Sequence, residues 1–455
     1  MISVASLTPR RGRNVELLLL VIAVGIVVLA YANVEVAARG ELPANLLAQT
    51  LGLLAIAGTF HLVLRWRASY ADPLLLPIVT LLNGLGLVML HRIDIARGNE
   101  FSSGLALRQL TWSALAVGIA IAVLVVLRDH RLLRRYTYSA GLAAVVLLLM
   151  PLLPFIGREE FGARIWIRVG SFTFQPGEVA KIALAIFFAG YLVSARDALS
   201  VSGKKVLGLI LPRAKDLGPI LVAWVLSLGI LVFQRDLGSS LLFFGLFIAM
   251  LYVATERVSW IAIGLALLGV GAYFAYGTFA HLQTRVHLWL DPFAPGQSDQ
   301  VAKGLMGLAA GGLVGTGLGR GRPTETYVVE SDFIFTAFGE ELGLIGLFAM
   351  ILLYALLVQR GLRAAVGVRD GFGKLLATGL AFSIALQCFV VIGGLTRVIP
   401  LTGLTTPFLS AGGSSLLANW TIVALLLRIS DQARRPLDET PPKVSAEPTE
   451  MVRAS

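Results

Sequence analysis

The chain has 455 residues, of which 56% are hydrophobic and only 14% charged, so it has too little polar surface to solvate a globular protein of that size. This composition, with a mean hydropathy of +0.80, indicates a membrane protein. The excess positive charge of +11 is expected on cytoplasmic loops rather than at a nucleic-acid surface. A single cysteine excludes an intrachain disulfide scaffold, and the five histidines show no metal-ligand spacing.

Apolar runs of about 20 residues, the length that crosses a bilayer, recur along the whole chain. Twelve such runs begin near residues 16, 45, 73, 109, 138, 178, 218, 239, 259, 340, 376 and 411. We therefore predict an all-α polytopic membrane protein, a bundle of twelve transmembrane helices without a β domain.

The basic residues of alternate loops predict the orientation, because Lys and Arg are retained on the cytoplasmic side. With the N-terminus inside, 24 Lys and Arg fall on cytoplasmic segments and 13 on outer segments, while Lys181 lies within a span. Both termini are therefore expected in the cytoplasm. The basic segment 1–15 precedes the first span, and the Pro-, Glu- and Thr-rich tail 431–455 is expected to be disordered.

Two long outer loops, 157–177 and 278–332, are rich in glycine, aromatic and charged residues, and function concentrates in loops of this kind. The second loop contains a glycine-rich stretch, 311–319. It follows no strand–helix pattern, so it is not predicted to bind a nucleotide. No soluble catalytic domain is evident, and any chemistry is expected at the membrane.

Charged side chains at bilayer depth are costly, so those present are expected to pair or to line a wet cavity. Glu178 and Lys181 stand three residues apart at the start of the sixth span. They form either an internal ion pair or part of a polar cavity for an anionic or sugar ligand.

Two polar turns each allow a structural and a ligand-binding interpretation. Residues 234–240, which include Gln234 and Asp236, form either a satisfied outer turn or a ligand site. Residues 407–415 provide either close helix packing through small side chains or a nest of backbone amides able to hold phosphate.

Five motifs in this order resemble the SEDS family of bacterial cell-wall polymerases, whose members include RodA, FtsW and SpoVE. They are residues 162–167 with 174–181, the turn 234–238, the segment 331–335, the helix 339–343, and 400–403 through 412–415. The resemblance implies a ten-helix core over 73–430 preceded by two additional helices in 16–72, with the large outer loop between the ninth and tenth spans. This arrangement looks most like the RodA type of actinobacteria.

The resemblance also implies an activity. It is the polymerisation of lipid II onto a nascent glycan in the bacterial plasma membrane, during elongation or division, with release of undecaprenyl pyrophosphate. A class B penicillin-binding protein that cross-links the glycan is the implied partner, beside other elongation or division proteins. No cofactor is expected apart from a divalent cation, Mg²⁺ or Mn²⁺, at the diphosphate. A lipid II flippase and a non-catalytic lipid II-binding scaffold remain alternative functions.

The sequence departs from the family pattern in the long outer loop. The family reads Asp-Pro-x-x-Asp-Pro there, whereas this chain has Asp291-Pro292-Phe293-Ala294-Pro295, followed by Asp299. We favour Asp291 over Asp299 as the catalytic base, with a mere helix cap at Asp291, before Pro292, as the alternative. The residues predicted to bind substrate are Arg164, Glu178, Lys181, Gln234, Asp236, Arg285, Lys303, Asp332, Glu341 and Ser414.

Overall fold

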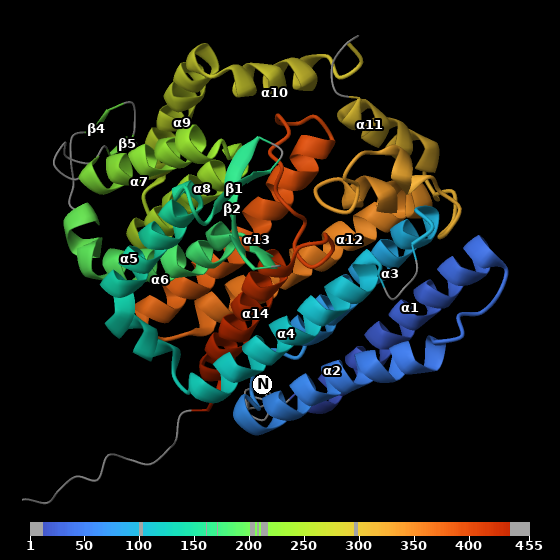
Figure 1. The fold of residues 1–455 in the computed structure, drawn as a ribbon. Helices are drawn as coiled ribbons and strands as arrows, with labels where there is room; N and C mark the ends of the chain where they lie inside the picture. Colours follow the sequence, from blue (N-terminus) through green and yellow to red (C-terminus); the bar gives the residue numbers. More distant parts are fainter. Residues whose placement is uncertain are drawn as a thin grey trace, which may run out of the picture.

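The computed structural model in Figure 1 describes residues 12–99, 103–160, 162–170, 172–200, 205–206, 209–210, 217–294 and 299–436. Its long helices are α1 (Arg13–Arg39), α2 (Leu46–Arg67), α3 (Leu75–Ala96), α4 (Leu105–Val126), α5 (Thr137–Leu149), α6 (Pro176–Ser200), α7 (Gly218–Gly229), α8 (Leu237–Thr255), α9 (Val258–Thr278), α12 (Ile334–Gly367), α13 (Gly371–Leu395) and α14 (Gly413–Arg434). Short 3₁₀ helices lie at His130–Tyr136, Met150–Leu152 and Pro323–Glu325, and a π-helix at Ile230–Gln234 continues α7.

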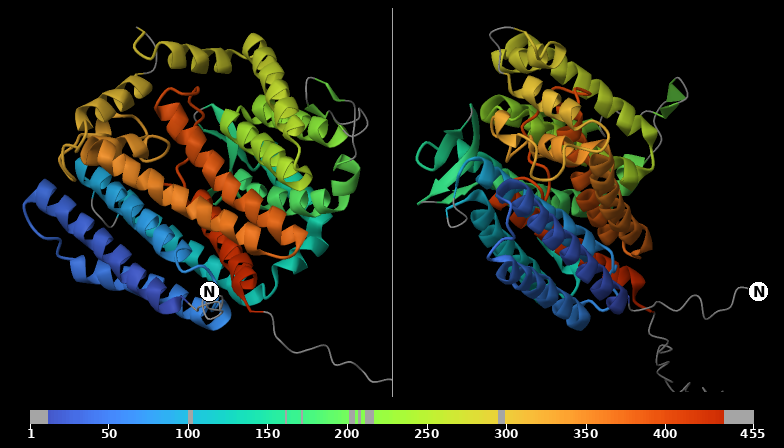
Figure 2. Two further views of the ribbon diagram at one scale, coloured as in Figure 1. Left: turned by 180° about the vertical axis from the view of Figure 1, so that it is seen from behind. Right: turned by 90° about the vertical axis from the view of Figure 1, so that its right-hand side faces the viewer.

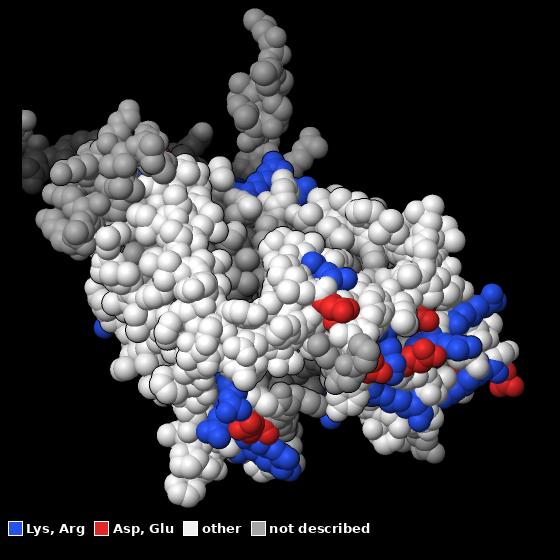
Figure 3. Space-filling model, turned by 90° about the horizontal axis from the view of Figure 1, so that it is seen from above, with Lys and Arg blue, Asp and Glu red and all other residues white. Residues whose placement is uncertain are grey.

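A helix lies at each of the twelve predicted spans. Within the described residues, 11 helices are long and apolar enough to cross a membrane, and a shorter apolar helix lies at Leu221–Gln234. Seen from above, most of the surface is uncharged, and the charged side chains gather mainly on one side (Figure 3). The all-α polytopic fold predicted from hydropathy is thus confirmed.

Two further helices, α10 (Ala280–Leu290) and α11 (Gln300–Gly311), connect α9 to α12 across one end of the bundle (Figure 1). We call this the outer end and the opposite end, where α1 begins and α14 finishes, the inner end. The views from behind and from the side show α1 and α2 together on one flank of the bundle (Figure 2).

The outer segment 157–177 contains a feature that the sequence did not predict. Strands β1 (Gly157–Glu160), β2 (Ala163–Val169) and β3 (Phe172–Phe174) pair in an antiparallel sheet in that order. A two-stranded pair, β4 (Lys205–Val206) and β5 (Leu209–Ile210), lies between α6 and α7. These strands are short, and they do not alter the helical fold class.

Helix α12 is broken at Gly343, which has φ +66° and ψ −171°, a conformation that only glycine adopts readily. A break inside a membrane helix frees backbone groups that must find other partners. Residues 311–321, here called the Gly loop, supply them. The bonds are Leu344 N to Gly312 O at 3.0 Å, Ile345 N to Leu313 O at 3.1 Å, Thr316 N to Glu340 O at 3.0 Å and Gly317 N to Glu341 O at 3.0 Å.

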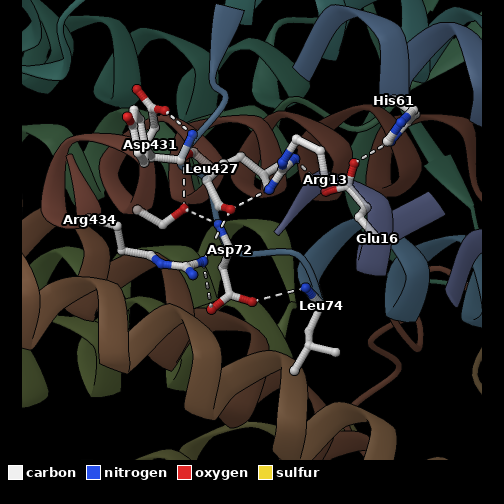
Figure 4. A network of polar contacts seen from close by, with 11 residues as sticks. Arg13, Glu16, His61, Asp72, Leu74, Leu427, Asp431 and Arg434 are labelled. Carbon is white, nitrogen blue, oxygen red and sulfur yellow. Dashed lines mark hydrogen bonds and ion pairs between the residues drawn. The ribbon is translucent and has the colours of Figure 1, made fainter. Parts of the chain in front are cut away.

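The two N-terminal helices are fastened to the rest of the bundle at the inner end by a buried polar network (Figure 4). The carboxylate of Glu16 binds Arg13 and lies 2.7 Å from Nδ1 of His61, and the Arg13 guanidinium donates to the carbonyl of Ala71. Arg13, Glu16 and His61 are all almost completely buried. Because buried charges are stable only when paired, this network holds α1 against α2 and the following turn.

The segment predicted to be a disordered tail, 431–455, begins within a helix. Helix α14 continues to Arg434, and Asp431 is buried, accepting a hydrogen bond from the backbone N–H of Tyr70 at 2.8 Å. Setting the tail boundary at residue 431 was therefore wrong, because composition cannot reveal that this carboxylate has a distant backbone partner. Residues 1–11 and 437–455 lie outside the described residues.

Candidate functional site

Helix α10 is anchored to segment 396–412, which connects α13 to α14. Arg285 Nη1 donates to the carbonyl oxygen of Leu401 at 2.7 Å. A Cβ atom added at Gly403 would lie 3.9 Å from the Arg285 Nη2 atom. The side chain of Arg285 is thus directed from the outer loop toward the start of the last span.

The end of α10 is fixed by reciprocal bonds with Arg397. Trp289 Nε1 donates to the carbonyl of Arg397 at 2.9 Å. Arg397 Nε and Nη2 donate in return to the carbonyls of Trp289 and Leu290, at 2.9 and 2.7 Å. These bonds define where the chain leaves α10, and hence the position of Asp291.

Asp236, Arg285 and Asp332, three of the predicted binding residues, form one electrostatic cluster at the outer end. Asp236 caps α8, accepting from the N–H of Ser239 at 3.0 Å. Burial raises the pKa of Asp332 to about 6, although the neighbouring Arg285 opposes the rise. Burial likewise raises the pKa of Asp236. Burial lowers the pKa of Arg285, and the negative charges of Asp236 and Asp332 oppose that decrease.

Asp291 is exposed at the C-terminal end of α10. Its side chain accepts a hydrogen bond from the N–H of Phe293 at 3.2 Å, which closes a short turn. The alternative that Asp291 caps a helix beginning at Pro292 was wrong, because α10 ends here and a turn follows. The carboxylate is therefore presented at the rim of the outer end.

Asp299 lies on the other side of residues 295–298, at the start of α11. Its carboxylate is 2.6 Å from Lys303 Nζ, and both side chains are exposed. The hydrogen bond from Lys303 lowers the pKa of Asp299. Two of the predicted site residues thus neutralise each other.

Glu178 and Lys181 lie inside the bundle, as predicted. Lys181 Nζ is 2.9 Å from Glu178 Oε2, 2.8 Å from Gln387 Oε1 and 3.5 Å from Asn419 Oδ1, and its side chain is 1% exposed. Gln387 also donates to the carbonyl of Thr405 at 2.9 Å. The cluster therefore reaches the segment that precedes the last span.

Ser414 stands at the start of α14 and links it to α6. Its hydroxyl accepts the backbone N–H of Gln175 at 2.9 Å. The preceding Gly413 touches the ring of Trp112, where an added Cβ would come within 2.3 Å. The glycine at 413 serves close packing, one of the two roles predicted for this turn.

Glu341 is fully buried in the first half of α12, where it organises the Gly loop. Its carboxylate accepts the N–H of Gly319 at 2.8 Å and of Gly321 at 3.2 Å, and it pairs with Arg92 Nε at 2.9 Å. Arg92 Nη2 also donates to the carbonyl of Gly321 at 2.6 Å. These contacts account for its charge without a ligand.

The remaining predicted residues lie around the small sheet. Arg164 pairs with Glu159 at 2.9 Å, and Arg235 reaches the same carboxylate at 3.3 Å. Gln234 is buried and donates to the carbonyl of Leu148. The Arg235–Glu159 pair connects the sheet to the turn before α8, which also carries Asp236.

The sequence reasoning missed Arg92, Gln387, Asn419 and Arg397. The first three are polar residues inside apolar runs, and this signal could have identified them, since polar groups in a membrane helix need partners. No local signal marks Arg397, whose role depends on α10 folding back over segment 396–412.

The described residues contain no group of three or more His, Cys, Asp or Glu side chains that could hold a metal ion. Asp236 and Asp332 offer oxygen ligands, but Arg285 already supplies positive charge beside both. These residues therefore do not fit a resident metal ion.

A model of the FtsW, RodA and SpoVE proteins, described as cell cycle protein, matches residues 73–435. Peptidoglycan glycosyltransferase RodA of Mycobacterium tuberculosis is 49% identical over 434 residues, covering 94% of this chain and 92% of the relative. Stage V sporulation protein E of Bacillus subtilis is 33% identical over 378 residues, covering 81% of this chain and 99% of the relative.

Two solved structures share the fold. A chain of a peptidoglycan synthase complex that coordinates polymerization and crosslinking aligns with a TM-score of 0.63 at 25% identity, over 80% of this chain and 98% of that one. The crystal structure of RodA from Thermus thermophilus aligns with a TM-score of 0.56 at 24% identity, over 79% of this chain and 96% of that one.

Proposed function

This chain belongs to the FtsW, RodA and SpoVE family, and from that premise we propose that it is a peptidoglycan glycosyltransferase acting at the outer end of its bundle. It is a multi-pass membrane protein, so both substrates can reach it while anchored in the lipid bilayer. The donor is lipid II and the acceptor is a lipid-linked glycan. The family model matches from residue 73 onward and so does not include the two N-terminal helices. The alignment with the mycobacterial relative, in contrast, covers most of the chain.

The transfer joins an acceptor hydroxyl oxygen to the anomeric carbon of the donor as the bond to the diphosphate breaks. The hydroxyl proton passes to a carboxylate, and undecaprenyl pyrophosphate leaves with the bonding electron pair. The protein must therefore hold a carboxylate at the membrane surface and place positive charge near the diphosphate.

The observation that carries the proposal is the anchoring of α10 over the outer end. Arg397 fixes the last two residues of α10, so Asp291 stands in a defined place on the exposed rim. We assign Asp291 as the base because it is reachable from the membrane surface, whereas the carboxylate of Asp299 is occupied by Lys303.

The cluster of Asp236, Arg285 and Asp332 includes a residue of α10, the helix that ends at Asp291. With all three side chains ionised its net charge is negative, which favours a hydroxyl donor over a second anion. Exposed basic residues of the outer loop outside the Asp299–Lys303 pair, such as Arg320, would meet the diphosphate. A divalent cation, Mg²⁺ or Mn²⁺, carried by the diphosphate would add positive charge there.

A transpeptidase partner is also proposed. The structural neighbour comes from a complex that couples polymerization to crosslinking, which supports a class B penicillin-binding protein as partner. Other elongation or division proteins would join the same assembly, and nucleic acid would not.

The test is polymerisation of labelled lipid II by the full chain with its cognate transpeptidase. We expect Asp291→Asn to lower the polymerisation rate by about 10² to 10⁴-fold, the usual contribution of a general base. Asp299→Asn is the matched control, since it neutralises an equally exposed acid close by, and it should retain most of the activity.

Equal activity of Asp291→Asn and the parent would place the base elsewhere. Asp332 would be the next candidate, because a pKa of about 6 suits proton acceptance near neutral pH. If the parent with its partner makes no polymer, the catalytic proposal fails and a scaffold role gains.

A further inference from the structure

The two N-terminal helices are not loosely attached, because α1 is fixed at both ends. The network of Arg13, Glu16 and His61 holds it at the inner end (Figure 4). Near the outer end Glu35 Oε1 lies 2.7 Å from His91 Nε2 of α3, and both side chains are buried. Helix α1 is therefore held by buried polar contacts near both of its ends.

The outer end of α1 packs directly on the Gly loop. Gly319 is buried with φ +85°, and a Cβ atom added there would lie 2.8 Å from the Ala37 Cβ and 3.0 Å from the Val34 carbonyl oxygen. The neighbouring Leu318 packs against an apolar cluster of α1 and α3. The buried members of this cluster are Val27, Ala30, Tyr31, Val34 and Val88.

The Gly loop is in turn bound to parts of the candidate site. It follows α11, which carries Lys303, and it fills the break of α12 at Gly343. Eleven residues after its end stands Asp332. A displacement of the Gly loop would thus be transmitted both to α11 and to the segment that carries Asp332.

Three elements meet at this point, and each is tied to the other two. Helix α1 binds α3 through Glu35 and His91, and α3 binds the Gly loop through Arg92, which pairs with Glu341 and donates to the carbonyl of Gly321. The Gly loop closes the triangle at Gly319 on α1. This third contact is made by the bare backbone of Gly319, where an added Cβ atom would lie only 2.8 Å from Ala37 and 3.0 Å from the Val34 carbonyl oxygen.

We propose that α1 is the support of the Gly loop and thereby sets the rate of glycosyl transfer, with Ala37 as the positioning residue. The inference rests on the proposed function. It gives the N-terminal helices a role in catalysis, in addition to crossing the membrane.

The test compares Ala37→Trp with Ala38→Trp in the full chain with its partner. Ala37→Trp places a bulky side chain beside Gly319, whereas Ala38, which is exposed like Ala37, lies about 100° further around the helix. We expect Ala37→Trp to speed amide hydrogen exchange in residues 315–321 and to lower kcat about tenfold at an unchanged KM for lipid II, because a misplacement of about 1 Å can cost about a hundredfold. Ala38→Trp should leave both quantities unchanged, and Ala37→Ser should keep both at the parent values.

Leu318→Ala is a second variant, which loosens the same contact from the side of the loop. It should also speed amide hydrogen exchange in the loop and lower kcat, and it keeps the test possible if Ala37→Trp fails to fold. Unchanged loop exchange in the variants that fold would overturn the inference, as would faster exchange with an unchanged kcat. A parent that makes no polymer would instead refute the proposed function, while the exchange comparison would still decide whether α1 supports the loop.

Discussion

Lys181 combines complete burial with a full set of polar partners. Its ammonium group is held by Glu178, Gln387 and Asn419, on three different helices. Removing one partner of a buried ion pair costs about 3–5 kcal/mol, because the other charge is left without compensation. Loss of stability and loss of function must therefore be separated at this residue.

Lys181→Met should lower thermal stability and abolish polymerisation, because Glu178 would be left as a buried, uncompensated charge. The double variant Lys181→Met with Glu178→Gln removes both charges and should recover much of the melting temperature without recovering polymerisation. Melting temperature and lipid II polymerisation are measured on the same preparations. If both recover together, the pair serves the fold alone.

At the scale of elements, the break in α12 explains the glycine-rich sequence of the outer loop. The Gly loop takes over the hydrogen bonds that the helix loses at Gly343, and the approach is so close that a Cβ atom at Gly315 would lie 2.3 Å from the carbonyl oxygen of Glu341. The glycines are thus required by backbone contact within the membrane protein.

Gly343→Ala should destabilise the protein strongly. The new Cβ would lie 2.3 Å from the Gly315 backbone nitrogen, and the strained backbone adds about 1–3 kcal/mol. Gly118→Ala is the control, since its Cβ would meet nothing within 4 Å in α4, and it should leave the melting temperature the same or raise it. Equal melting temperatures for the two variants would mean that the break at Gly343 does not occur in solution.

At the scale of the whole molecule, the basic residues predict which end faces the cytoplasm. The twelve helices place residues 200 and 300 at opposite ends of the bundle, after α6 and at the start of α11. The sequence has 24 Lys and Arg on the segments predicted to be cytoplasmic and 13 on those predicted to be outer, so the inner end should be cytoplasmic.

Reporter fusions at these two positions test the orientation. An alkaline phosphatase fusion should be active at residue 300 and inactive at residue 200, and a fluorescent protein that matures only in the cytoplasm should give the opposite pattern. The same activity at both positions would contradict the twelve-span topology, and the reverse pattern would contradict the orientation alone.

The sequence by itself determined the number and order of the membrane helices. A run of about 20 apolar residues is visible in the local sequence, and it is long enough to cross the hydrocarbon core of a bilayer. It also identified Glu178 and Lys181, since charge within an apolar run is visible without a structure. The small sheet at 157–174 and the helical end of α14 escaped prediction, because each depends on partners that local composition does not specify.

Only the tertiary structure decided how the predicted residues are grouped. Asp236, Arg285 and Asp332 come from three segments and meet because α10 folds back onto segment 396–412. Glu341 was predicted to bind substrate, yet in the fold its charge is taken up by Arg92 and the Gly loop. Contacts between residues far apart in the chain depend on how the helices pack, and the hydropathy of a single helix contains no information about its neighbours.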